Sequence, residues 1–158
     1  MLIETMQRAG AAQPRVLLSG GDFSRLRDLA RATMARHPVE DAAKDAQFLL
    51  EELDRADIVP PDWIPTGIVG MNSYVEFRDD PAGTVRRLQL VYPYQANLEA
   101  GRLSVLSLVG AALIGLAERQ SITWQARDGR DRCLTVLRTS NEPFTTGADA
   151  AASAGDAG

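Results

Sequence analysis

Apolar side chains recur at intervals of three and four residues in the first third of the chain. The residues with this spacing are Phe23, Leu26, Leu29, Ala30 and Met34. Asp22 stands where a helix N-cap belongs, and Pro38 cannot continue a helix because proline lacks the backbone donor. The pattern therefore predicts an amphipathic helix from Asp22 to just before Pro38.

A second run with the same spacing predicts a helix from Asp41 to about Arg55. Its apolar stripe consists of Ala42, Ala46, Leu49, Leu50 and Leu53. Glu51 precedes Arg55 by four residues, an interval at which opposite charges pair on a helix surface. Two helices joined by a short turn should pack antiparallel. They predict a short coiled-coil hairpin about 22 Å long, at about 1.5 Å per residue.

The expected tip of this hairpin carries three acids, Glu40, Asp41 and Asp45. Carboxylates at a helix N-terminus stabilise the positive end of the helix dipole by about 0.3 to 1 kcal/mol each, which by itself accounts for them. Alternatively, acids at the end of a projecting hairpin could reach a metal ion or a basic groove on a partner. Both interpretations stay open at the level of sequence.

After Gly67 the period of the apolar residues changes from helical to two, which predicts strands with one buried face. The alternating residues are Val69, Met71, Val75 and Phe77. Turn-forming residues at 79–83 lead back into a strand at 84–92, and further strands are expected at 121–126 and 132–138. These segments predict an antiparallel sheet of four or five strands.

The most apolar segment, residues 103–116, carries no charge. It is shorter than the roughly 20 residues that span a bilayer, so it predicts a buried core element. We expect a brief strand at about 103–106 and a helix at about 109–116 that covers the sheet. Gly110, Ala111 and Ala112 are small enough to allow close backbone approach there.

The chain is thus predicted to be an α+β protein, a short antiparallel helical hairpin followed by an antiparallel sheet domain with one covering helix. The expected divisions are a flexible arm (1–14), the hairpin (15–58), a proline-rich linker (59–66), the sheet domain (67–144) and a disordered tail (145–158).

Charge and composition narrow the classes of function. The 17 basic and 21 acidic residues give a net charge of -4, which disfavours strong direct binding to DNA or RNA. A single cysteine, Cys133, and a single histidine, His37, provide neither a disulfide nor a zinc cluster. Nucleotide-binding and hydrolase motifs are lacking, and neither a targeting segment nor a membrane span is evident. We expect a cytoplasmic, non-enzymatic protein without metal or cofactor.

Four segments resemble the GreA/GreB family of transcription elongation factors, and within it the Rnk group, named for regulation of nucleoside diphosphate kinase. They are ELDRA at 52–56, IVGMNSYVEFR at 68–78, LVYP at 90–93 and LSVLSLVGAALIGL at 103–116. The similarity covers about residues 15–143 with the segments in matching order.

This resemblance implies a helical hairpin followed by an FKBP-like C-terminal domain. It also implies RNA polymerase as the partner, bound at the mouth of the secondary channel. Gre proteins insert a long coiled coil there and promote cleavage of backtracked RNA by helping to hold catalytic magnesium. The hairpin expected here is shorter, so the resemblance implies competition with those factors, without support for cleavage. We expect the chain to be a monomer or a weak oligomer.

In the Gre proteins a Ser-x-x-Ser-Pro turn before the core helix contacts polymerase. By position, the resemblance assigns this contact to Ser104, Leu106, Ser107 and Leu108. Two features depart from the family pattern. Leu108 replaces a proline, and residues 118–120 replace a Gly-Asp turn.

Two other functions remain as alternatives. An FKBP-like prolyl isomerase, or a chaperone-like binding module, would need an aromatic pocket, for which Tyr74, Phe77, Tyr92 and Trp124 are the candidates, although core packing explains them more simply. A direct effect on nucleoside diphosphate kinase is suggested by the name of the Rnk group.

Overall fold

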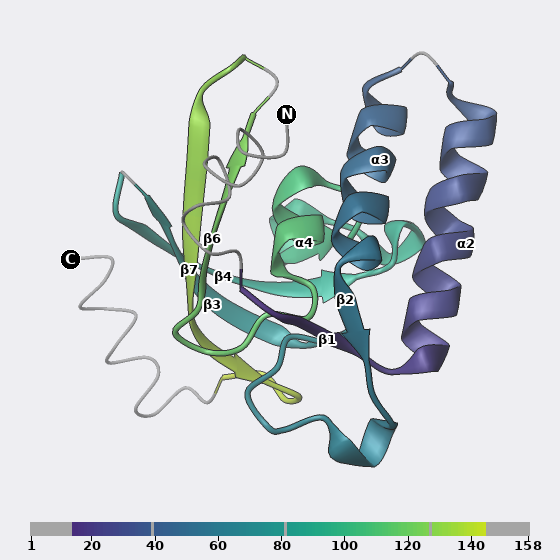
Figure 1. Ribbon diagram of the computed structural model, residues 1–158. Helices are drawn as coiled ribbons and strands as arrows, with labels where there is room; N and C mark the ends of the chain where they lie inside the picture. The colour runs from purple at the N-terminus through teal and green to yellow at the C-terminus, as the bar shows by residue number, and fades with distance from the viewer. Residues whose placement is uncertain (1–13, 39, 81, 127, 145–158) are drawn as a thin grey trace, which may run out of the picture.

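The computed structural model describes residues 14–38, 40–80, 82–126 and 128–144 of the 158-residue chain. It contains a helical hairpin beside a curled, five-stranded mixed sheet, which confirms the predicted α+β class (Figure 1). Apart from Pro14, the expected N-terminal arm and C-terminal tail lie outside the described residues.

The hairpin consists of α2 (Gly20–Arg36) and α3 (Asp41–Asp54). The expected N-cap is wrong by three residues, because Ser19 caps α2 by accepting a hydrogen bond from the Asp22 backbone N–H at 3.2 Å. Asp22 lies instead in the first turn, near the positive end of the helix dipole. Ser19 is thus the N-cap residue, and Gly20 and Gly21 form the first positions of the helix.

A two-stranded parallel sheet ties the ends of the hairpin together, a feature the sequence did not predict. It pairs β1 (Val16–Leu18) with β2 (Ala56–Ile58). Arg55 does not pair with Glu51 as expected. It binds the buried Glu52 at 2.7 Å and also donates to the Pro14 carbonyl, which lies next to β1. Arg55, held by its ion pair with Glu52, therefore joins the end of α3 to the start of the described chain through the Pro14 carbonyl.

The main sheet has the strand order β5-β4-β3-β7-β6. Its strands are β3 (Tyr74–Asp80), β4 (Thr84–Val91), β5 (Arg102–Ser104), β6 (Ser121–Gln125) and β7 (Asp131–Ser140). The pairings are antiparallel as expected except for β4 with β5, which is parallel. A connection through two short 3-10 turns, Pro93–Gln95 and Leu98–Ala100, allows this by returning the chain in the same direction.

The covering helix α4 (Leu108–Leu113) is shorter than expected, since Ile114 leaves the helix and Gly115 takes a left-handed conformation. Close approach explains the small residues here. A Cβ added to Gly110 would lie 2.1 Å from the Ser104 carbonyl oxygen, and one added to Gly115 would lie 2.4 Å from a Val16 methyl group. The segment from Gly110 to Gly115 therefore packs closely against the end of β5 on one side and against β1 on the other.

Hairpin and sheet share one hydrophobic core. Leu49 and Leu53 of α3 belong to the same buried cluster as Ala111 and Leu113 of α4 and Phe77 of β3. Figure 1 shows α4 between the sheet and the hairpin, with the hairpin tip and the β6–β7 turn at the same end of the molecule. The linker between α3 and the sheet domain includes a 3-10 turn, Pro61–Trp63. The hairpin is thus packed along its side and does not stand free.

Candidate partner-binding site

The turn between β5 and α4 is held by its two serines. Ser107 caps α4, accepting from the Gly110 N–H at 3.0 Å and donating to the Ser104 carbonyl at 2.7 Å. The Ser104 hydroxyl accepts from the Leu106 N–H at 3.0 Å. Both hydroxyls thus hydrogen-bond within the turn. Leu106 and Leu108 are the residues of this segment that are better suited to apolar contact.

The two leucines of this turn face different surroundings. Leu106 is half-buried and packs against the core cluster. Leu108 is also half-buried but lines a groove between the hairpin and the sheet domain, where the family pattern has a proline. The four residues that the family resemblance assigned to polymerase binding therefore lie in or at the ends of one turn, and Leu108 lines the groove beside the hairpin.

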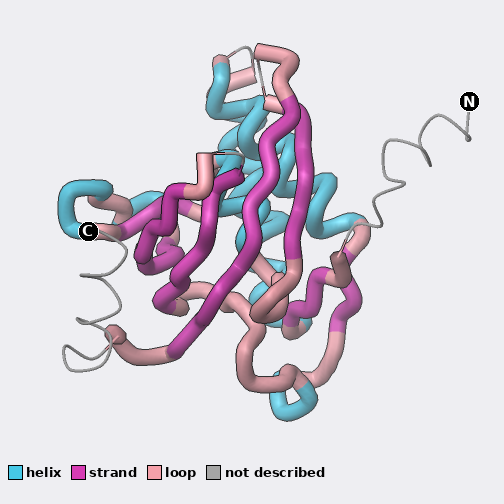
Figure 2. Tube along the Cα trace, turned by 90° about the vertical axis from the view of Figure 1, so that its left-hand side faces the viewer, coloured by secondary structure: helices cyan, strands magenta, loops and turns pink. Residues whose placement is uncertain are grey.

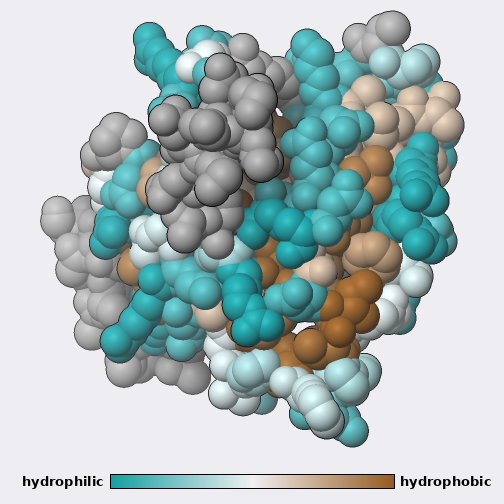
Figure 3. All heavy atoms as spheres, in the orientation of Figure 1, coloured by the Kyte–Doolittle hydropathy of each residue, from teal (hydrophilic) through white to brown (hydrophobic). Residues whose placement is uncertain are grey.

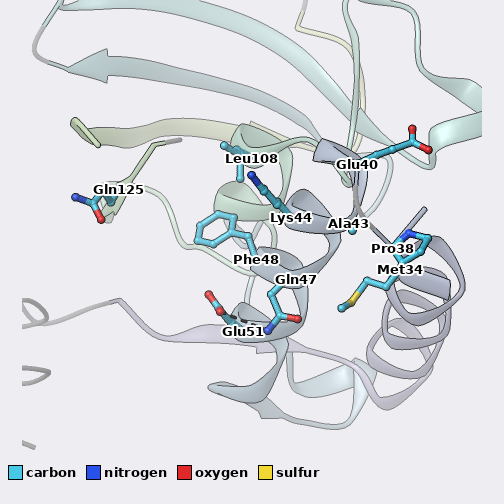
Figure 4. A pocket seen from close by; sticks show the side chains of 10 residues that line it. All are labelled: Met34, Pro38, Glu40, Ala43, Lys44, Gln47, Phe48, Glu51, Leu108 and Gln125. Carbon is cyan, nitrogen blue, oxygen red and sulfur yellow. Dashed lines mark hydrogen bonds between the residues drawn. The ribbon is translucent and has the colours of Figure 1, made fainter. Parts of the chain in front are cut away.

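This hairpin groove has a volume of about 460 Å³ and is open to solvent (Figure 4). Its lining residues are Met34, Pro38, Glu40, Ala43, Lys44, Gln47, Phe48, Glu51, Leu108 and Gln125. Among them, Phe48 is half-buried, and its ring packs against that of Trp124 at a centroid distance of 6.2 Å. Sequence reasoning missed Lys44, Phe48 and Glu51, although their spacing of three and four residues places them on one face of α3.

The tip acids have defined roles in part. Glu40 is the N-cap residue of α3, and its carboxylate lies 3.0 Å from Nδ1 of His37, the C-cap residue of α2. This contact links the ends of the two helices at the tip. Asp41 lies in the first turn of α3, where a negative charge is favourable, and Asp45 follows one turn later. Within the described residues, no group of three or more His, Cys, Asp and Glu side chains is placed to hold a metal ion.

The aromatic residues considered for an isomerase pocket do not share one environment. Phe77 and Trp124 are buried in the core, whereas Tyr74 lines a hollow on the opposite face of the sheet. Tyr92 is half-buried. Burial raises the pKa of its phenol above the ordinary value, and the nearby Asp22 carboxylate acts in the same direction. These positions agree with structural roles for Phe77 and Trp124.

None of the described helices is long and apolar enough to cross a membrane.

Two family models match successive parts of the chain. Residues 14–59 match the family model described as the Rnk N-terminus, and residues 64–141 match that of the GreA/GreB transcription elongation factor C-terminus. The chain is similar to the regulator of nucleoside diphosphate kinase of Escherichia coli strain K12, with 36% identity over 137 residues. This match covers 86% of the chain and 96% of that relative.

Two further similarities are to elongation factors. Transcription elongation factor GreA of Syntrophobacter fumaroxidans is 32% identical over 123 residues, covering 78% of this chain and 76% of that protein. A solved GreA/GreB structure from Nitrosomonas europaea superposes with a TM-score of 0.59 at 30% identity, covering 81% of this chain and 99% of that one.

Proposed function

Because the chain belongs to the GreA/GreB family of transcription elongation factors, in its Rnk group, we propose that it binds RNA polymerase at the secondary channel and regulates elongation in the cytoplasm. The C-terminal domain docks on polymerase, and the hairpin obstructs the channel without supporting RNA cleavage. Gre-type factors with longer coiled coils are thereby excluded. The supporting observation is that the C-terminal domain matches the family model, while the preceding hairpin is short and packs along its side against that domain.

The length of the hairpin supports obstruction and not catalysis. The 17 residues of α2 extend about 25 Å at about 1.5 Å per residue. Because α3 is buried against α4 along its side, the hairpin cannot swing outward without exposing core residues such as Leu49. The depth to which the tip enters the channel is therefore fixed by its distance from the proposed docking turn, residues 104–108.

The tip chemistry supports the same interpretation. His37 and Glu40 pair with each other, and Asp41 stabilises the start of α3. Holding a catalytic magnesium ion typically requires carboxylates that are oriented together toward the ion. The tip is better suited to filling space in the channel than to coordinating metal.

The docking contact is tested by co-purification of the full-length chain with core RNA polymerase. We expect wild type to bind at micromolar concentration and Leu108→Arg to weaken binding about tenfold or more, because a charge is placed at a desolvated contact. Trp63→Arg is the matched control, since Trp63 is 74% exposed on the linker and lies outside the docking turn. Absence of wild-type binding, or equal loss in both variants, would refute the proposal.

Competition is tested by transcript cleavage in stalled elongation complexes that contain a GreA-type factor. Adding this chain should inhibit cleavage in proportion to occupancy, whereas the chain alone should produce no cleavage. Glu40→Ala and Asp41→Ala should inhibit as well as wild type, because the tip acts by its volume. Cleavage produced by the chain alone, and lost in these variants, would instead assign the acids a catalytic role. Deletion of the hairpin is unsuitable here because it would open the shared core.

A second candidate function is a direct effect on nucleoside diphosphate kinase, favoured by the name of the Escherichia coli relative. Mixing the purified chain with the kinase and measuring phosphate transfer separates the two. A change in kinase activity that survives Leu108→Arg would support this function independently of polymerase docking. Unchanged activity at excess of the chain would exclude it.

A further inference from the structure

One face of α3 lines the hairpin groove and extends to the base of the helix. Lys44, Phe48 and Glu51 of this face line the groove. Arg55 follows Glu51 by four residues, so it continues the same face. The opposite wall includes Gln125 of β6, an edge strand of the main sheet. Figure 2 shows the hairpin helices behind the strands, so the groove lies on the side of the sheet that the helices cover.

The N-terminal segment of the chain enters the described structure at the base of this face. Arg55 donates to the carbonyl of Pro14, the first described residue. Residues 1–13 precede it, and an extended chain spans about 3.3 Å per residue, or about 40 Å in all. The path along α3 from Arg55 back to Lys44 is about 17 Å at about 1.5 Å per residue. The segment is therefore long enough to follow the groove.

The groove presents apolar side chains to solvent. Phe48 and Leu108 are half-buried, and Met34 of α2 adds an adaptable side chain. Such a surface gains stability when another apolar group removes it from water. The segment before Pro14 carries four large apolar residues, Met1, Leu2, Ile3 and Met6.

Charged residues follow in a complementary order on the two surfaces. From its base toward the tip, α3 presents Glu51 and then Lys44, about 10 Å apart at about 1.5 Å per residue. Going back from Pro14, the segment presents Arg8 and then Glu4, about 13 Å apart if extended. Each charge of the segment therefore meets an opposite charge on α3.

Both charges of α3 are able to bind such a partner. Lys44 is exposed, and within the described part of the chain it forms no ion pair. Glu51 is also exposed, and its Oε2 accepts a long hydrogen bond of 3.5 Å from Gln47, which leaves Oε1 for an arginine. Glu40, at the tip end of the groove, is held by His37 at 3.0 Å.

We propose that residues 1–13 fold back along α3 and occupy the hairpin groove. Their apolar side chains pack against Phe48 and Leu108, and Glu4 and Arg8 pair with the opposite charges of α3. Because Leu108 is then covered, the segment inhibits docking on polymerase until it is displaced. This inhibitory consequence rests on the proposed function, whereas occupation of the groove does not.

The C-terminal segment is a poorer occupant of the groove. Residues 145–158 include no large apolar side chain. They follow Phe144, which lines a hollow on the opposite face of the sheet together with Tyr74. The groove therefore favours the N-terminal segment over the C-terminal one.

A second apolar area offers the N-terminal segment less. Figure 3 shows it in brown at the base of the hairpin, around β1 and β2, where Ile58 is 51% exposed. The charged residues there, Arg15 and Asp57, pair with each other at 2.9 Å. This area can take apolar side chains, but its charges are already matched.

The contact is tested by cross-linking the full-length chain with a water-soluble carbodiimide, which joins a carboxylate directly to an amine. Lys44 is the only lysine in the sequence, so a linked side-chain amine is assigned without ambiguity. We expect peptide mass spectrometry to find an amide between Glu4 and Lys44 of the same chain. Ile3→Asn should lower its yield about tenfold, because a polar side chain replaces an apolar one in the groove. Thr5→Asn, the matched control, removes no large apolar group and should retain most of the yield.

Trypsin cleavage after Arg8 provides a second measurement, since a docked segment is protected. Ile3→Asn should accelerate this cleavage about fivefold. Lys44→Gln should accelerate it about twofold, because Glu4 loses an exposed ion pair. Arg86→Gln should leave the rate unchanged, because Arg86 is exposed on β4, which two strands separate from β6.

Occupation of the groove is overturned if wild type forms no link between Glu4 and Lys44 and is cleaved after Arg8 as fast as Ile3→Asn. A link that joins two chains and increases with protein concentration would also overturn it, because the groove would then hold a second copy.

Polymerase co-purification tests the inhibitory consequence separately. Ile3→Asn should bind core polymerase about fivefold more tightly than wild type, because a larger fraction of the chain has Leu108 uncovered. Equal affinity of the two proteins would refute inhibition by the segment. Absence of binding by both would refute the docking proposal instead, and the cross-link would still decide whether the groove is occupied.

Discussion

At the scale of single residues, the turn before α4 contains two kinds of residue, those that hold its shape and the one proposed to contact a partner. Ser104 and Ser107 hold the turn through hydrogen bonds within it, and Gly110 allows the turn to lie against the helix. Leu108 is then presented at the mouth of the hairpin groove. A change at the serines or the glycine should act through stability, and a change at Leu108 through binding.

Gly110→Ala should destabilise the protein by about 3 kcal/mol, because the new methyl group would lie 2.1 Å from the Ser104 carbonyl oxygen. Gly70→Ala is the control, since its Cβ would come no closer than 3.7 Å to the Ser73 hydroxyl. That variant should change the free energy of unfolding by less than about 1 kcal/mol. Urea denaturation measures both values, and similar losses would contradict the close packing at Gly110.

Ser107→Ala should lower the free energy of unfolding by about 1 kcal/mol, because α4 loses its capping acceptor. Ser107→Thr keeps a hydroxyl that both donates and accepts and should retain most of that stability. Chemical denaturation of the three proteins provides the comparison. If Ser107→Ala were as stable as wild type, the cap would not contribute to stability.

Tyr92 should form its phenolate at a higher pH than an ordinary tyrosine, because burial and the Asp22 charge raise its pKa. A raised pKa in the folded state means that the associated stability is fully present below about pH 10 and is lost as pH rises through the folded value. Ultraviolet absorbance titration of wild type and Tyr92→Phe isolates this step. A difference curve with the pKa of free tyrosine would contradict the expectation.

At the scale of elements, the hairpin is fixed at its base and along its side. At the base, Arg55 joins Glu52 to the Pro14 carbonyl, and the exposed Arg15 pairs with Asp57 of β2 at 2.9 Å. Along the side, the Phe48 ring of α3 meets Trp124 of β6. The face of α3 that carries Lys44, Phe48 and Glu51 lines the same groove as Leu108.

Phe48→Ala should cost about 2 kcal/mol of stability, because a half-buried ring is removed from its contact with Trp124. The same change should alter Trp124 fluorescence, which is best measured in a Trp63→Phe background since Trp63 is exposed. Gln47→Ala, at the neighbouring exposed position, should change neither stability nor fluorescence appreciably. Unaltered Trp124 emission in Phe48→Ala would show that the two rings are not in contact.

At the scale of the whole molecule, hairpin and sheet form one structural unit. Leu26 of α2, Leu49 of α3 and Phe77 of β3 all belong to a single buried cluster. The position of the hairpin tip relative to the turn between β5 and α4 is thereby fixed, as the proposed channel-blocking role requires.

The protein should accordingly unfold in a single transition. Helical circular dichroism, which is dominated by α2 and α3, and Trp124 fluorescence, which reports on the sheet domain, should give the same urea midpoint in the Trp63→Phe background. A hairpin that stood free of the sheet domain would lose its circular dichroism at lower urea. Separated midpoints would therefore contradict the shared core.

The sequence by itself determined the class of the fold and most of its elements, because helix and strand periods are properties of neighbouring residues. The ends of α3 and β4 were predicted within one residue. Tertiary structure decided features that depend on distant partners. Strands β1 and β2 are too short to show a period, and their pairing brings Val16 opposite Ala56. The same holds for the parallel β4–β5 pairing and for the hairpin groove, whose walls come from separate parts of the chain. The local sequence pattern shows which face of a helix or strand is apolar. Which other element packs against that face depends on residues distant in the sequence and is seen only in the tertiary structure.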